Sequence, residues 1–159
     1  MSKNEEPNIF DFSDDWEEIQ PAIWQWVMWD TPNQEIVGWI IHLRMEEFTD
    51  KQTGEKRENL VCYMLTTSGD SVRFIVPTDL KIKIDTLDEK RKKANREWAD
   101  LMLKIVYTGK SKTLKGYEIK TFKVMTKKAP IPDKLKEYIP ELPSTEGELS
   151  ILEDLTDNE

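Results

Sequence analysis

Alternation of hydrophobic and polar positions predicts a chain built mainly of β-strands. From Val37 to Met45 every second residue is hydrophobic, which is the period of a strand with one buried face. Alternating or apolar runs of similar length recur four more times. The predicted strands are residues 35–48, 60–67, 71–76, 101–108 and 117–126. Gly38, inside the first of them, predicts a bulge or a tight bend.

The longest interval between predicted strands contains a helix pattern. Residues 85–99 are rich in helix-forming residues, with Thr86 as a predicted N-cap and Glu89 completing a capping box. Its middle is almost wholly polar, which predicts a helix lying on the surface. A second, short helix is predicted at 134–139 within a proline-rich stretch.

The order of these elements is strand, strand, strand, helix, strand, strand. A tight turn at 68–70 joins the second and third strands. This order predicts a mainly β fold, a five-stranded Greek-key barrel of the oligonucleotide/oligosaccharide-binding (OB) type with one helix between strands 3 and 4. The predicted organisation is an acidic flexible N-terminal arm (1–20), an OB-fold domain (21–128), a proline-rich exit segment (129–140) and an acidic flexible C-terminal tail (141–159).

Charge is sorted along the chain. Residues 1–20 hold seven acids and one base, and residues 141–159 hold seven acids and no base. Because the whole chain carries −8, the centre between these ends carries +5. Residues 104–128 alone hold eight lysines and one acid, Glu118. A basic centre with acidic ends is typical of a surface for a polyanion that also has an acidic arm. A solvated lysine face with solubilising tails explains the same pattern.

A family resemblance rests on several short motifs. They are Pro21-Ala-Ile-Trp24, Glu35-Ile-Val-Gly38, the stretch 60–70, Val106-Tyr-Thr-Gly-Lys110, and Gly116-Tyr117 with Phe122. Together they resemble a set of small phage and prophage OB-fold proteins that bind single-stranded DNA or assist replication. The resemblance spans residues 21–126. It implies a sequence-nonspecific single-stranded DNA-binding protein of phage-type replication or recombination. The single cysteine and the absence of a signal-like or membrane-spanning apolar run separately lead us to expect a cytoplasmic protein.

Binding an unpaired strand requires cations that track the phosphates and aromatic rings that stack on the bases. The chain interleaves both kinds of residue in its last two predicted strands and the loop between them. The hairpin of the second and third strands offers a further ring and a further cation. The predicted nucleic-acid-binding residues are Tyr63, Arg73, Lys104, Tyr107, Lys110, Lys112, Lys115, Tyr117, Lys120 and Lys123.

The acidic tail mixes leucines with carboxylates. Such a segment can compete with DNA for a basic groove, or dock onto replication or recombination proteins. The predicted docking residues are Leu152, Glu153, Asp154, Leu155 and Asp157.

Catalytic and metal-binding motifs do not appear in the sequence. His42 is the only histidine and Cys62 the only cysteine, so we expect no zinc site, no cofactor and no enzymatic activity. No apolar run reaches the length of a membrane span. Trp26 and Trp29 are candidates for an exposed surface or a homodimer contact.

Two other functions explain the same sequence. The chain can be an acidic adaptor or inhibitor that mimics DNA and docks on a host enzyme, in which case the acidic ends form the active surface. RNA binding shares the physics of single-stranded DNA binding, so it is the second alternative.

Overall fold

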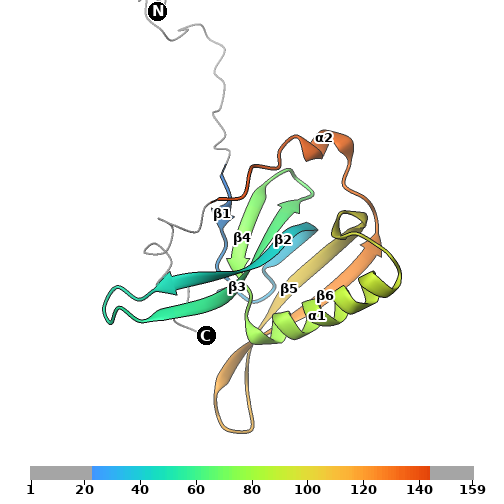
Figure 1. Ribbon diagram of the computed structural model, residues 1–159. Helices are drawn as coiled ribbons and strands as arrows, with labels where there is room; N and C mark the ends of the chain where they lie inside the picture. The colour runs from blue at the N-terminus through green and yellow to red at the C-terminus, as the bar shows by residue number, and fades with distance from the viewer. Residues whose placement is uncertain (1–22, 144–159) are drawn as a thin grey trace, which may run out of the picture.

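The computed structural model describes residues 23–143, which form one open six-stranded sheet and one long helix (Figure 1). All five predicted strands are present, and a two-residue strand precedes them. The strands are β1 (Gln25–Trp26), β2 (Glu35–Thr49), β3 (Lys56–Thr66), β4 (Ser71–Ile75), β5 (Leu101–Lys112) and β6 (Glu118–Lys128). Their order across the sheet is β1-β4-β3-β2-β5-β6. The mainly β prediction, with the helix between β4 and β5, is therefore confirmed.

The long strand β2 connects the two halves of the sheet. Its first residues, Glu35–Gly38, pair with β5, and residues from Gly38 onward pair with β3. Gly38 belongs to both ladders, and a Cβ at this position would lie 2.0 Å from the carbonyl oxygen of Leu65. The register shifts between Ile40 and His42. The irregularity thus lies two to four residues beyond Gly38, and glycine is needed at position 38 because the β3 backbone passes so close.

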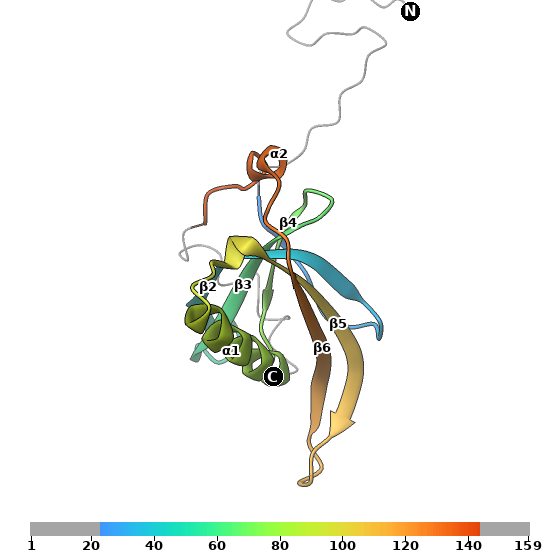
Figure 2. The same ribbon diagram turned by 90° about the vertical axis from the view of Figure 1, so that its right-hand side faces the viewer.

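The main core lies between the inner face of the sheet and helix α1 (Thr78–Lys93), which packs against β6. Alternate residues of the strands point into it, such as Cys62 and Met64 of β3 and Leu103 and Ile105 of β5. Leu80 and Ile84 of α1 close it and are fully buried. Figure 2 shows α1 beside the sheet, with the β5–β6 hairpin projecting past both.

Helix α1 begins seven residues before the predicted start. Pro77 precedes it in an extended conformation, and the Leu80–Ile84 spacing of four residues places both on the core face. Thr86 is an interior residue, because its hydroxyl donates to the carbonyl of Ile82. The predicted Thr86–Glu89 capping box is therefore wrong. The helix ends at Lys93, before Asn95 with a φ of 55°, and a 3₁₀ turn (Trp98–Asp100) leads into β5.

Two terminal segments pack on the outer face of β2, β3 and β4, and the end of the first, Trp29, turns into the main core. The N-terminal strap (residues 23–29) contains β1, which pairs in parallel with β4. The C-terminal strap (residues 129–143) contains the short helix α2 (Asp133–Lys136), close to the predicted 134–139. Ile131 is buried against Trp39 and Leu65 of the sheet. The predicted exit segment thus packs back onto the sheet.

Candidate nucleic-acid interface

The β5–β6 hairpin extends beyond the rest of the sheet. Tyr107 is the last β5 residue whose backbone bonds to the segment leading into β2, through Asn33 and Gln34. From there residues 108–121, here called the lysine hairpin, form a two-stranded ribbon (Figures 1 and 2). The lysine hairpin contains four lysines and one acid, Glu118. The projecting hairpin is therefore strongly basic.

One face of the lysine hairpin gathers three of the predicted lysines. Lys110 lies directly opposite Lys120, and Lys112 lies opposite Glu118. Because directly opposed residues of an antiparallel pair share a face, all four side chains point to the same side. Lys110 Nζ lies 3.9 Å from Glu118 Oε1, an exposed pair of small energetic value. Like charges placed directly opposite each other destabilise a hairpin, so this arrangement favours an anionic ligand.

The other face of the same strands holds a second lysine group. Lys104 lies opposite Met125, and Lys123 lies opposite Val106. Lys127, which the sequence analysis did not single out, lies opposite Met102 on this face. Lys104 and Lys127 line a hollow of about 280 Å³ together with Val37, Met102, Leu103, Met125 and Thr126. The predicted lysines therefore divide between two faces, and only the strand register reveals the division.

The tip of the lysine hairpin exposes two large side chains. A tight turn is closed by hydrogen bonds from the Thr113 amide to the Tyr117 carbonyl (2.8 Å) and from the Gly116 amide to the Thr113 carbonyl (2.9 Å). Gly116 has a φ of 87°, a conformation that favours glycine. Tyr117 is 69% exposed, as base stacking requires, and Leu114 is fully exposed. Sequence reasoning missed Leu114, although a leucine between lysines in a glycine turn has no core to enter.

Two predicted stacking residues are buried, and those predictions are wrong. Tyr107 is 2% exposed because it continues the inward alternation of β5 and packs against Trp29 and Phe122. Tyr63 has no exposed surface, because the N-terminal strap places Trp24 edge-on at a centroid distance of 5.1 Å. Neither ring can stack on a base.

Arg73 and two tryptophans also differ from expectation. Arg73 is 6% exposed, and its guanidinium lies over the Trp26 ring at 4.2 Å. The prediction of Arg73 as a phosphate contact is therefore wrong, because the N-terminal strap covers it. Trp29, predicted at the surface, is buried against Phe74 and Phe122. Trp26 is half-buried.

A buried polar cluster lies beneath the straps. Tyr63 donates a short hydrogen bond to Glu46, and Arg44 Nε donates to the same carboxylate oxygen at 2.6 Å. Burial, with the bond to Glu46, raises the pKa of Tyr63 above its ordinary value. Arg44 also donates to the Pro143 carbonyl at 2.5 Å, and the Trp24 indole donates to the Glu141 carbonyl at 3.0 Å. The cluster therefore fastens the C-terminal strap and leaves Arg44 neutralised.

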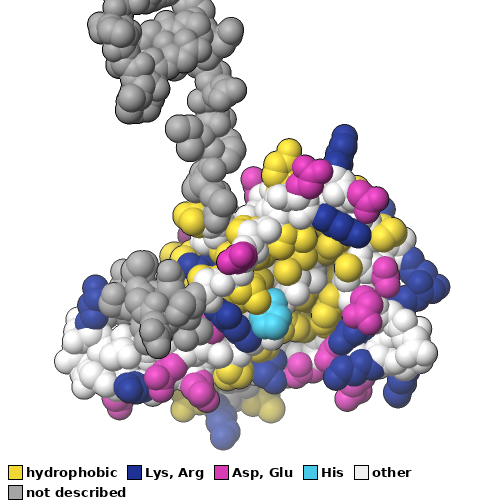
Figure 3. Space-filling view, turned by 45° about the horizontal axis from the view of Figure 1, so that its top comes forward, with side chains coloured by type: hydrophobic (Ala, Val, Ile, Leu, Met, Phe, Trp, Pro, Cys, Tyr) yellow, Lys and Arg dark blue, Asp and Glu magenta, His cyan; other side chains and the backbone are white. Residues whose placement is uncertain are grey.

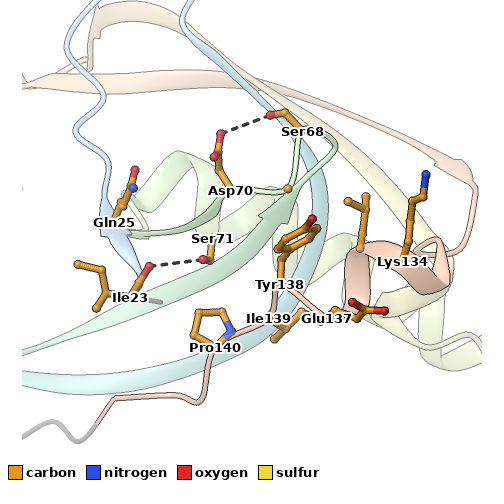
Figure 4. A pocket seen from close by; sticks show the side chains of 12 residues that line it. Ile23, Gln25, Ser68, Asp70, Ser71, Lys134, Glu137, Tyr138, Ile139 and Pro140 are labelled. Atoms are coloured by element: carbon orange, nitrogen blue, oxygen red, sulfur yellow. Dashed lines mark hydrogen bonds between the residues drawn. The ribbon is translucent and has the colours of Figure 1, made fainter. Parts of the chain in front are cut away.

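A larger hollow, of about 700 Å³, separates the β3–β4 turn from the C-terminal strap (Figure 4). Asp70 and Glu137 border it, with Lys134 as the lining cation. The balance of these charges is negative, which does not suit a phosphate chain. In the view of Figure 3, charged side chains of both signs surround a central hydrophobic area. That face likewise offers no surface of one sign.

Metal binding and membrane crossing are two further properties that the described residues can be checked for. Within residues 23–143 no group of three or more histidine, cysteine, aspartate or glutamate residues is arranged to hold a metal ion. Over the same range no helix has the length and apolar character needed to cross a membrane. The predicted docking residues of the tail, 152–157, lie outside the described residues.

Comparison of the chain with protein-family models, with curated proteins and with solved structures finds no match.

Proposed function

We propose that the protein binds single-stranded DNA without sequence preference, through the lysine hairpin of an OB-type barrel, in replication or recombination. The connectivity supports the barrel: a three-strand meander β2-β3-β4, a helix, and a hairpin β5-β6 whose first strand pairs with β2. In OB folds the loop joining the last two strands is one of the ligand-binding loops. The lysine hairpin occupies the corresponding position.

The observation that carries the proposal is the direct opposition of Lys110 and Lys120 on a hairpin with no neighbouring strand. Folding alone gains nothing from this pair, because the two ammonium groups repel each other. A phosphate between them would convert the repulsion into two attractions and release counterions. Tyr117, exposed at the tip, supplies the sequence-tolerant stacking that single-strand binders use.

Fluorescence anisotropy with labelled oligo-dT tests the proposal. We expect micromolar or tighter binding at 50 mM salt, with an affinity that falls as salt rises. The double variant Lys110→Gln/Lys120→Gln removes two phosphate contacts. The slope of log affinity against log salt should therefore become shallower by about 1.4, from ~0.7 per contact on a single strand.

The matched control removes two lysines from the far end of α1. Lys90 and Lys93 are exposed, and no ion pair of either is found among the described residues. Lys90→Gln/Lys93→Gln should leave the salt slope unchanged. Equal losses in both double variants would contradict the assignment to the hairpin, because they would indicate a diffuse electrostatic effect.

Truncation tests whether the acidic tail competes with DNA. The cut belongs after Pro143, because residues 141–143 accept hydrogen bonds from the folded unit. Removing 144–159 should strengthen DNA binding if the tail competes for the lysines. No binding at 50 mM salt, with or without the tail, would reject the proposal. Equal competition by oligo-U would extend it to RNA.

A further inference from the structure

The tip of the lysine hairpin carries large apolar and aromatic side chains, whereas its two strands, here called the stem, carry lysines. Leu114 is fully exposed and Tyr117 is 69% exposed. In the chain Lys112 precedes Leu114, and Lys115 lies between Leu114 and Tyr117. A single exposed leucine on a protein surface is ordinary. This one lies in the turn of the lysine hairpin, and that hairpin projects away from the sheet and α1 (Figures 1 and 2). Its position therefore makes contact with a second molecule easy.

The dimensions of the hairpin suit a nucleic-acid groove or fork. From Tyr107 to Lys112 the strand rises about 17 Å, at ~3.4 Å per residue, before the turn begins. A two-stranded ribbon is narrow enough to enter the major groove of a duplex. The lysines along the stem lie where they can follow the phosphates on either side of an inserted tip.

The chemistry of the tip favours a junction between single and double strands. Leucine is among the side chains that proteins insert between base steps as wedges. Inside a duplex such insertion requires unstacking a base step, which is costly. At a junction the last base pair already presents an unstacked face, so an apolar side chain can cover it without breaking any stack.

We infer that Leu114 and Tyr117 form a wedge that seats on the terminal base pair where single-stranded DNA meets duplex. This inference rests on the proposed single-strand binding and adds a substrate class to it. The stem lysines hold the unpaired strand while the tip caps the duplex end. The protein therefore binds a strand that adjoins a duplex more tightly than an isolated strand of the same length.

The test compares oligo-dT with the same oligo-dT joined to a short duplex, at one salt concentration. Wild-type protein should bind the junction at least about fivefold more tightly than isolated oligo-dT. This factor corresponds to about 1 kcal/mol, the lower limit for stacking on one base. Leu114→Ser should lose most of that preference and leave binding to isolated oligo-dT within about twofold. The duplex also adds phosphates, and any affinity gained from them should persist in Leu114→Ser. The affinity lost in this variant therefore measures the contribution of the wedge alone. 2-Aminopurine in the terminal pair should report contact with the tip.

The control variant is Ile82→Ser, which removes a 60% exposed apolar side chain from α1. It should keep the full junction preference. If wild-type protein binds both DNAs equally, the wedge is overturned while single-strand binding stands. If Leu114→Ser weakens both DNAs by the same factor, the tip is a general contact and the wedge is again overturned. If neither DNA binds, the proposed function itself fails, and the wedge fails with it.

Discussion

Replacing Lys120 by threonine should stabilise the protein and weaken its binding to DNA at the same time. Lys120 is half-buried and lies directly opposite Lys110 on the lysine hairpin. Two unit charges about 6 Å apart in water repel by ~0.7 kcal/mol. Measured cross-strand pair effects lie between about 0.2 and 1 kcal/mol. The nearby Glu118 offsets part of this repulsion, so we expect a gain of about 0.5 kcal/mol.

Threonine is also a better strand former than lysine, so the gain needs a matched control. Lys123→Thr makes the same replacement on the same strand, but Lys123 faces Val106 on the opposite face. The difference between the two variants isolates the repulsion from β-propensity. Scanning calorimetry should give Lys120→Thr a Tm about 1–3 °C above that of Lys123→Thr in 50 mM salt.

Salt supplies the second half of this test. At 1 M salt the screening length falls to about 3 Å, so the Tm difference between the two variants should vanish. In anisotropy measurements Lys120→Thr should bind oligo-dT more weakly, with a salt slope shallower by about 0.7. A Tm difference that persists in 1 M salt, or that has the opposite sign, would refute the reasoning.

Three further predictions concern the buried parts of the fold. Tyr63→Phe removes the hydroxyl that bridges to Glu46 and should reduce the free energy of unfolding in urea by about 1–3 kcal/mol; a neutral substitution would contradict the bond. Because the folded state raises the pKa of Tyr63, stability should fall as pH rises above about 10, the unfolded value, and less steeply in Tyr63→Phe. Gly38→Ala places a Cβ against the Leu65 carbonyl and should lower the free energy of unfolding by about 3 kcal/mol or more, measured in thermal melts followed by circular dichroism. An unchanged Tm would show that the β2–β3 pairing can shift to make room for the methyl group. Cys62 is fully buried and its thiol pKa is raised, so it should react with a thiol reagent only on unfolding, and rapid native labelling would contradict its burial.

Local alternation was sufficient to predict the strands. The positions of Val72 and Phe74 define β4, and those of Leu103 and Ile105 define β5. The same alternation places Tyr107 on the inner face, so its burial was readable from the sequence. Base stacking needs an exposed ring, so the stacking role predicted for Tyr107 contradicted its inward position in the strand. The early start of α1 was also readable, from Pro77 followed by apolar residues four apart.

The burial of Tyr63 and Arg73 was not readable in this way. Both lie on the outer face of their strands, as the alternation predicts. Their covers, Trp24 and Trp26, belong to a strap more than thirty residues earlier in the chain. The partner of Trp24 at Glu141 is more distant still. A local pattern does not indicate which distant segment covers a given face of the sheet. The outer face of β3 and β4 was therefore predicted to be exposed to solvent.

For the proposed DNA binding, the straps limit where a strand has room. In OB folds the face of the second and third strands and two of the loops contact the ligand. In the proposed barrel the corresponding face is β3 and β4, which the two straps cover. On the neighbouring strand β2, Glu46 neutralises the charge of Arg44. The loop between β2 and β3 mixes Asp50 and Glu55 with Lys51, so it has no strong sign. The remaining loop is the lysine hairpin, whose lysines are exposed or half-buried and outnumber its single acid. With the usual face covered, the lysine hairpin is the basic loop left open at this end of the sheet, so in the proposed function a strand is held by a hairpin rather than across a groove.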